Sequence, residues 1–234
     1  MSEPSEVPTA APDPTPDPPA PAPPAPAPAL VARGLALRTR EGVVFEGVDV
    51  TVPHGALLSV HGPAGSGRTM LLLALCGRAA VTAGTVDGPD PRRRTALAAT
   101  GGPVALEPAL TVGAHERERR LLGPVRRPLD DVAALLGLHL DRDARVADLD
   151  RADAVLFAVA LAAQGDPDLV AADDVDAGLG AADLDRVGAA LRALADAGTA
   201  VVTTSHDPLP WATAALAVGA ASPAPGGRGR HEKP

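Results

Sequence analysis

An eight-residue, glycine-rich loop carries the clearest chemical signal in the sequence. It fits the pattern G-x-x-x-x-G-K-S/T, except that arginine stands where lysine is expected; its members are Gly62, Pro63, Ala64, Gly65, Ser66, Gly67, Arg68 and Thr69. Glycines let the backbone approach an anion without an intervening Cβ, so the amide groups of such a loop point at one place. The loop predicts a phosphate cradle in which the Thr69 hydroxyl faces Mg²⁺. The alternative is an ordinary glycine-rich turn between a strand and a helix.

Further polar residues follow two strand-like apolar runs. Asp173 and Asp174 come directly after residues 169–172, and His206 follows residues 199–204. In an open parallel sheet the carboxyl ends of strands meet at one edge, where ligands collect. We therefore expect Asp173 to hold a hydrated metal ion and Asp174 to orient water beside the phosphate loop. Taken alone, His206 fits a strand-end histidine without chemistry, and its position favours the site.

Alternating strand-like and helix-like segments must position these residues. The chain then predicts an α/β fold in which a parallel sheet is covered by helices on both faces. Strands are expected at residues 43–52, 56–60, 169–172 and 199–204, and helices at 70–80, 129–140, 151–164 and 181–197.

Composition bounds the remaining possibilities. The 234 residues carry a net charge of −8, one cysteine and three aromatic residues, which argues against nucleic-acid binding and excludes an intramolecular disulfide. The longest apolar run, residues 154–163, is too short to cross a bilayer, so we expect a cytoplasmic protein that reaches a membrane only through a partner. The histidines other than His206 show no metal-ligand spacing. Residues 1–29, with twelve prolines, and residues 222–234 are expected to be disordered tails.

In order and spacing, these motifs resemble the nucleotide-binding subunits of ATP-binding cassette (ABC) transporters over roughly residues 30–215. In this resemblance residues 62–69 correspond to the Walker A loop, and residues 110–112 to the element that opens the helical subdomain. Residues 149–153 fall at the signature motif and residues 177–180 at the D-loop. Asp173 matches the Walker B aspartate, Asp174 the catalytic glutamate and His206 the switch histidine.

The resemblance implies a P-loop NTPase fold of the ABC ATPase type within residues 30–221. Its parallel-sheet core would carry an N-terminal β-subdomain and a short helical subdomain at about residues 110–160. ATP and Mg²⁺ are the implied ligands, with residues 62–69 on the nucleotide, Thr69 and Asp173 on the metal, and Asp174 and His206 in catalytic positions. The implied partners are an integral-membrane transporter subunit and another nucleotide-binding subunit, at the inner face of the membrane.

Several residues depart from the family pattern. Arg68 replaces the Walker A lysine, Asp174 is one methylene shorter than glutamate, and Gly180 removes the D-loop carboxylate. No glutamine lies between residues 84 and 112, so Thr100 or Gly101 occupies the Q-loop position. For the adenine-stacking aromatic the sequence leaves two positions open: Thr39 lies near the expected place, and Phe45 is the only aromatic residue nearby.

The signature segment departs most. Arg151 and Ala152 are expected to place side chains where the family presents bare backbone to the γ-phosphate of a second subunit, and Asp150 adds a negative charge there. The competing interpretation, which we favour, makes Asp150 the N-cap of a helix that ends near Gln164.

Together these observations predict an ABC-type subunit that binds ATP with weak or lost hydrolysis. One alternative is a cassette that binds no nucleotide and has a structural or regulatory role. Another is a phosphate-loop kinase of a small molecule, which the spacing of Asp173, Asp174 and His206 disfavours.

Overall fold

A parallel sheet forms the centre of the molecule in the computed structural model, which describes residues 27–87, 91–101 and 104–219. Its five strands have the order β10-β3-β9-β8-β5, and all neighbours are parallel. The strands are β3 (Leu57–His61), β5 (Thr95–Ala98), β8 (Leu169–Ala172), β9 (Ala200–Ser205) and β10 (Ala214–Ala217). Strands β8 and β9 are buried along their whole length, as expected for a sheet covered on both faces. The expected parallel α/β core is therefore confirmed.

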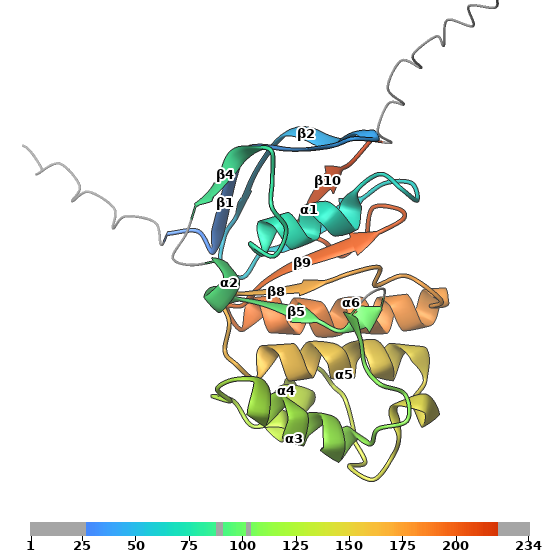
Figure 1. The fold of residues 1–234 in the computed structure, drawn as a ribbon. Coiled ribbons are helices and arrows are strands. Elements are labelled where there is room, and N and C mark those ends of the chain that lie inside the picture. The colour runs from blue at the N-terminus through green and yellow to red at the C-terminus, as the bar shows by residue number, and fades with distance from the viewer. Residues whose placement is uncertain (1–26, 88–90, 102–103, 220–234) are drawn as a thin grey trace, which may run out of the picture.

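An antiparallel sheet and one helix cover one face of this core. The sheet has the order β2-β1-β4, with β1 (Leu30–Thr39), β2 (Gly42–Val52) and β4 (Ala83–Asp87). Helix α1 (Arg68–Leu75) lies between the two sheets (Figure 1). Buried side chains of β1, β2, α1 and the parallel strands form one apolar cluster.

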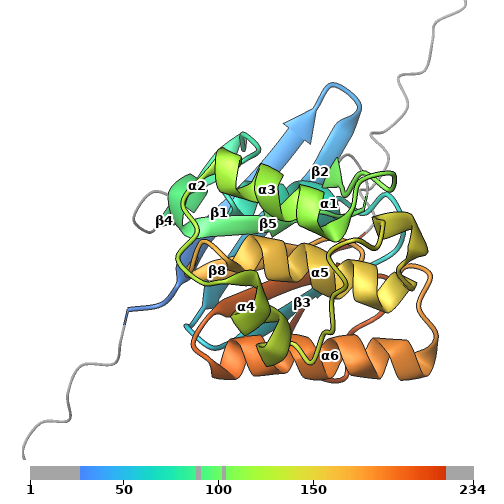
Figure 2. The same ribbon diagram turned by 90° about the horizontal axis from the view of Figure 1, so that it is seen from below.

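Helices cover the opposite face of the parallel sheet. Helix α5 (Arg151–Ala163) and helix α6 (Ala181–Asp196) lie side by side there (Figure 2). Helices α3 (Val112–Leu122) and α4 (Leu129–Leu135) form the outer layer, and α5 is buried almost throughout. The short elements are α2 (Pro91–Arg94), β6 (Thr100–Gly101), β7 (Val104–Ala105) and the 3₁₀ turn η1 (Val146–Asp148). Among the described residues, no helix is both long and apolar enough to span a membrane.

Two helices end earlier than the sequence pattern suggests. Helix α1 stops at Leu75 instead of Ala80, and α4 stops at Leu135 instead of Leu140. In each, a glycine with positive φ, Gly77 or Gly137, follows the helix and closes it with a Schellman pair of backbone hydrogen bonds. The apolar residues beyond each glycine continue the packing without continuing the helix.

The predicted tails lie outside the described residues, except for residues 27–29.

Candidate functional site

The glycine-rich loop lies between β3 and α1, the strand-to-helix connection that its sequence predicts. Gly67 is the N-cap of α1 and has a left-handed backbone with φ of 92°. A Cβ at Gly67 would come within 2.7 Å of the Val44 side chain, and one at Gly62 within 2.2 Å of the Val218 carbonyl oxygen. Both positions therefore require glycine, because Val44 and Val218 of the same chain leave no room for a Cβ atom.

The donors of this loop fit an anion. The first amide groups of α1 lack intrahelical acceptors, and the helix dipole favours negative charge at that end. Ser66, in the same loop, is buried, and its Oγ has no hydrogen-bond partner among the described atoms. A buried hydroxyl without a partner is costly unless another group satisfies it. A phosphate group held at the amino end of α1 fits these donors.

The Asp173 carboxylate lies at the amino end of α1 and accepts hydrogen bonds from two hydroxyl groups. Thr69 Oγ1, in the first turn of α1, donates to Asp173 Oδ2 at 2.8 Å. The Thr204 hydroxyl, on β9, donates to the other oxygen of the buried Asp173 carboxylate. A hydroxyl and one carboxylate form the sparse, hard donor set that Mg²⁺ uses when phosphate and water complete its shell. The residues expected as metal ligands are thus brought together, and they fit that ion.

Arg68 turns from the loop toward the ends of two strands. Its Nη1 donates to the Ser205 carbonyl oxygen at the end of β9, and its Nη2 donates to Asp174 Oδ1 at 3.0 Å. The Arg68 side chain is 12% exposed and that of Asp174 is 47% exposed. Sequence reasoning placed both residues at the site but did not anticipate their pairing.

Asp174 is held in an unusual backbone conformation. Its φ is +45°, a left-handed value that is uncommon for a residue with a side chain, and its N–H donates to Thr204 Oγ1 at 2.7 Å. Burial and the neighbouring Asp173 charge raise the pKa of the Asp174 carboxyl, while the Arg68 guanidinium opposes that shift. Asp176 adds a smaller upward effect on the same pKa.

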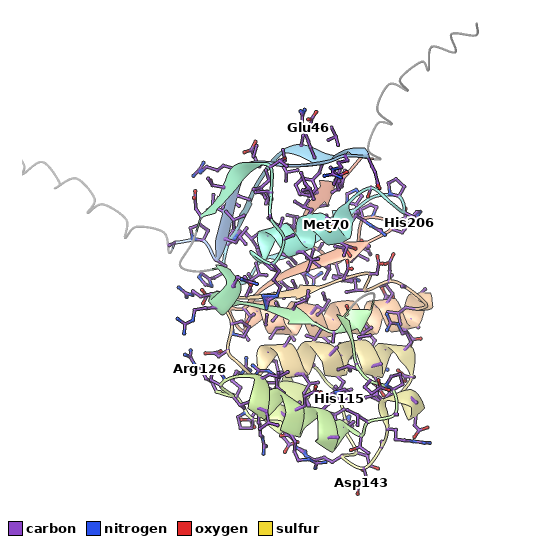
Figure 3. The ribbon with its side chains drawn as sticks, in the orientation of Figure 1. Glu46, Met70, His115, Arg126, Asp143 and His206 are labelled. Atoms are coloured by element: carbon purple, nitrogen blue, oxygen red, sulfur yellow. The ribbon has the colours of Figure 1, made fainter. Side chains whose placement is uncertain are left out.

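His206 lies at the same edge of the sheet (Figure 3). Its N–H donates to Asp176 Oδ2 at 2.8 Å, and its carbonyl oxygen accepts from Gly62 N–H at 3.2 Å. These contacts tie the backbone of His206 to the phosphate loop and leave the residue exposed. Sequence reasoning missed Asp176, whose only signal is its place in the acidic run after β8.

Neither residue considered for adenine stacking offers a ring to solvent. Phe45 is buried in the apolar cluster beneath the antiparallel sheet, and Thr39 is exposed at the turn between β1 and β2. The geometry therefore supports binding through phosphate groups more clearly than through a base.

The amino end of α5 confirms that Asp150 caps the helix. It contradicts the expectation that Arg151 and Ala152 place their side chains toward a second subunit. Asp150 is the N-cap, and its Oδ1 accepts from Asp153 N–H at 2.7 Å. Arg186 of α6 forms ion pairs with both Asp150 and Asp153. The expectation that Ala152 fills the space facing a second subunit is wrong, because Ala152 is buried in the core. At the second position of the helix the apolar periodicity of α5 turns the side chain inward.

Arg151 also departs from its expected direction. Its Nε donates to the Ala177 carbonyl oxygen at 3.0 Å, and its Nη2 donates to the Thr100 carbonyl oxygen at 2.9 Å. The side chain therefore ties α5 to the loop after β8 and to β6 of the same molecule. Thr100, at the position of the absent glutamine, is buried and donates through Oγ1 to the Asp173 carbonyl oxygen at 2.7 Å.

Comparison with known sequences places this site in a family context. The ABC transporter family profile matches residues 45–177. A cytochrome c biogenesis ATP-binding export protein, CcmA, from Cupriavidus necator is 33% identical over 146 residues, which cover 58% of this chain and 64% of that protein. A ribose import ATP-binding protein, RbsA, from Chelativorans is 30% identical over 173 residues, 68% of this chain and 34% of that protein. The chain thus spans less than two thirds of each relative.

Solved structures share the fold at low sequence identity. The cbiO1 protein of Clostridium perfringens, part of the ABC transporter complex cbiONQ, superposes with a TM-score of 0.70 at 14% identity, over 82% of this chain and 84% of that one. A dimeric ATP-binding cassette bound to ADP and Pi gives a TM-score of 0.66 at 16% identity, over 81% of this chain and 94% of that one.

Proposed function

Because the chain belongs to the ABC transporter family, we propose that it is an ATP-binding subunit that binds ATP and Mg²⁺ at residues 62–69 and works beside a separate membrane protein. One observation carries the proposal: the unpartnered Ser66 hydroxyl, the amino end of α1 and the Thr69–Asp173 pair converge at one sheet edge. We also propose a cytoplasmic location, at the inner face of the membrane. Family membership supports this location and the membrane partner, and the names of the relatives, an export and an import ATP-binding protein, support a role in transport.

Thr69 and Asp173 are the residues that would hold Mg²⁺. When bound, the ion supplies charge neutralisation for the phosphate oxygens. The protein would contribute the Thr69 hydroxyl and a carboxylate already oriented by Thr204. The buried position of Asp173 limits the freedom of that carboxylate.

We further propose that hydrolysis is slow. A planar arginine fork replaces a compact ammonium at residue 68, and the two groups are not equivalent at a phosphate site. Asp174, which would act on water, already accepts a hydrogen bond from Arg68. A misplacement of about 1 Å at a reacting group can cost on the order of 100-fold in rate.

A thermal-shift titration tests nucleotide binding. ATP with Mg²⁺ at about 100 times its Kd should stabilise the fold by about 2.7 kcal/mol, which corresponds to a rise in Tm of about 5–10 °C for a chain of this length. Asp173→Asn should lose the Mg²⁺-dependent part of that shift. Absence of any shift in the unmodified protein would instead support a nucleotide-free structural or regulatory cassette, and phosphoryl transfer to an acceptor would support a kinase.

Single-turnover hydrolysis tests the second part of the proposal. We expect the unmodified protein to hydrolyse bound ATP far more slowly than a cassette with the family residues. The double variant Arg68→Lys with Asp174→Glu should be faster, because it restores the ammonium and the longer carboxylate together. A rate that is already fast, and no faster in the double variant, would contradict the explanation.

A further inference from the structure

The Arg68 guanidinium already makes two directional hydrogen bonds within its own chain. One acceptor, the Ser205 carbonyl oxygen, ends β9, and the other, Asp174 Oδ1, follows β8. The planar arginine fork presents donors in a fixed arrangement, so it can meet two acceptors that belong to different strands. A lysine ammonium presents all of its donors from one atom at the end of a shorter side chain.

The Asp174 backbone is fixed independently of Arg68. Its N–H donates to Thr204 Oγ1, and its φ is left-handed. With the backbone held, the length of the side chain decides where the carboxylate lies. A glutamate here would carry the carboxylate one methylene farther than the position at which it now meets Arg68.

We propose that Arg68 and Asp174 are a compensated pair, in which the longer cation positions the shorter carboxylate and in which phosphate groups must compete with Asp174 for the guanidinium. This inference rests on the proposed function, because it treats the same loop as the nucleotide site. Residue 68 is thereby a positioning residue for Asp174 as well as a phosphate ligand. A triphosphate that takes the guanidinium would release the Asp174 carboxylate from its contact with Arg68.

If Arg68 and Asp174 are a compensated pair, single and double variants should differ in a defined way. Arg68→Lys alone shortens the cation, and Asp174→Glu alone lengthens the acid, so each single variant breaks the match. The double variant pairs a compact cation with a long carboxylate and restores it. The two substitutions should therefore be strongly non-additive, as contacting residues in one network usually are.

The first experiment measures this coupling without nucleotide. Urea unfolding of the four proteins, unmodified, Arg68→Lys, Asp174→Glu and the double variant, gives a double-mutant cycle. We expect a coupling of about three- to tenfold in the folding equilibrium constant, with the double variant more stable than the two single effects predict. Additive effects of the two substitutions would overturn the pairing.

The second experiment measures competition by calorimetric titration with ATP and Mg²⁺. Asp174→Asn should tighten binding about three- to tenfold, because Arg68 no longer has a carboxylate to leave. The control Asp207→Asn removes the same charge at an exposed residue just after β9, whereas Arg68 pairs with Asp174, and it should change affinity less than twofold. In an Arg68→Gln background the benefit of Asp174→Asn should fall to that of the control.

The two experiments separate the inference from the proposed function. If no variant binds ATP, the proposed function fails, while the urea cycle still decides whether Arg68 and Asp174 are coupled. If ATP binds and Asp174→Asn raises the affinity for ATP no more than Asp207→Asn does, the proposed competition between Asp174 and phosphate for the guanidinium is wrong.

Discussion

Arg68 joins groups that lie far apart in the sequence, since its two acceptors belong to residues 137 and 106 positions later in the chain. The motif alone predicts a cation aimed at phosphate. The direction that the side chain takes depends on which strand ends lie beside the loop, and that is a property of the folded sheet. The place of Arg68 at the phosphate site was therefore predictable from the sequence, and its contacts with Ser205 and Asp174 were not.

Cys76 gives a prediction at the same scale. The thiol is fully buried after α1, and burial raises its pKa to about 11, with Arg78 opposing the shift. Because the thiolate is the nucleophile, native protein should resist iodoacetamide at pH 8 and react only after unfolding. Labelling of native protein at the rate of a free thiol would contradict this.

The same shift makes stability depend on alkaline pH. A folded-state pKa above the unfolded value contributes stability that is present below about pH 9 and is lost as pH rises toward about 11. The loss is on the order of 2 kcal/mol. Urea midpoints at pH 8 and pH 10.5 measure it, and Cys76→Ala should show a flatter pH dependence over this interval.

At the scale of the element, the buried runs were the most predictable. Strands β8 and β9 and helices α5 and α6 agree closely with their expected ranges. The two strands are short continuous apolar runs, α5 is a longer one, and the buried residues of α6 recur at helical spacing. Strands β5 and β10 were missed, since the runs TALA and AALA are short and rich in alanine, which shows no strand preference. Pairing with β8 and β3, respectively, decides their structure.

Asp150 provides a prediction for an element. Asp150→Ala removes the N-cap of α5 and one ion-pair partner of Arg186. We expect a loss of about 1 kcal/mol in the free energy of unfolding, measured by urea denaturation. The control Asp148→Ala removes an exposed acid that pairs with Arg145 and should cost less than about 0.5 kcal/mol. Equal losses for the two variants would mean that the cap contributes nothing specific.

At the scale of the whole molecule, one edge of the parallel sheet gathers residues from the first turn of α1 and from the ends of β8 and β9. The amino end of α5 is connected to this edge through Arg151, which bonds to Ala177 and Thr100. A second molecule that approached α5 would meet a surface already engaged with its own loops.

This arrangement predicts that the isolated protein stays monomeric with ATP and Mg²⁺. The resemblance implies a dimer in which the signature motif of one subunit contacts the nucleotide of the other, and residues 149–153 fall at the position of that motif. Here the amino end of α5 carries the Asp150 and Asp153 carboxylates. Asp150 already accepts a hydrogen bond from the Asp153 N–H, one of the amide groups that would otherwise attract a phosphate. Arg186 pairs with both carboxylates but carries a single positive charge, so one negative charge remains at this helix end. Arg151 points to internal carbonyl groups instead of outward.

Sedimentation velocity with and without ATP and Mg²⁺ measures the oligomeric state directly. We expect one monomeric species under both conditions, and Asp150→Ser should allow more association than the unmodified protein, because it keeps a capping oxygen and removes the charge. The matched control Asp148→Ser removes an acid near α5 that does not cap it and should leave the monomer unchanged. A tight ATP-dependent dimer of the unmodified protein would show that the carboxylates at the start of α5 do not repel the nucleotide of a second molecule.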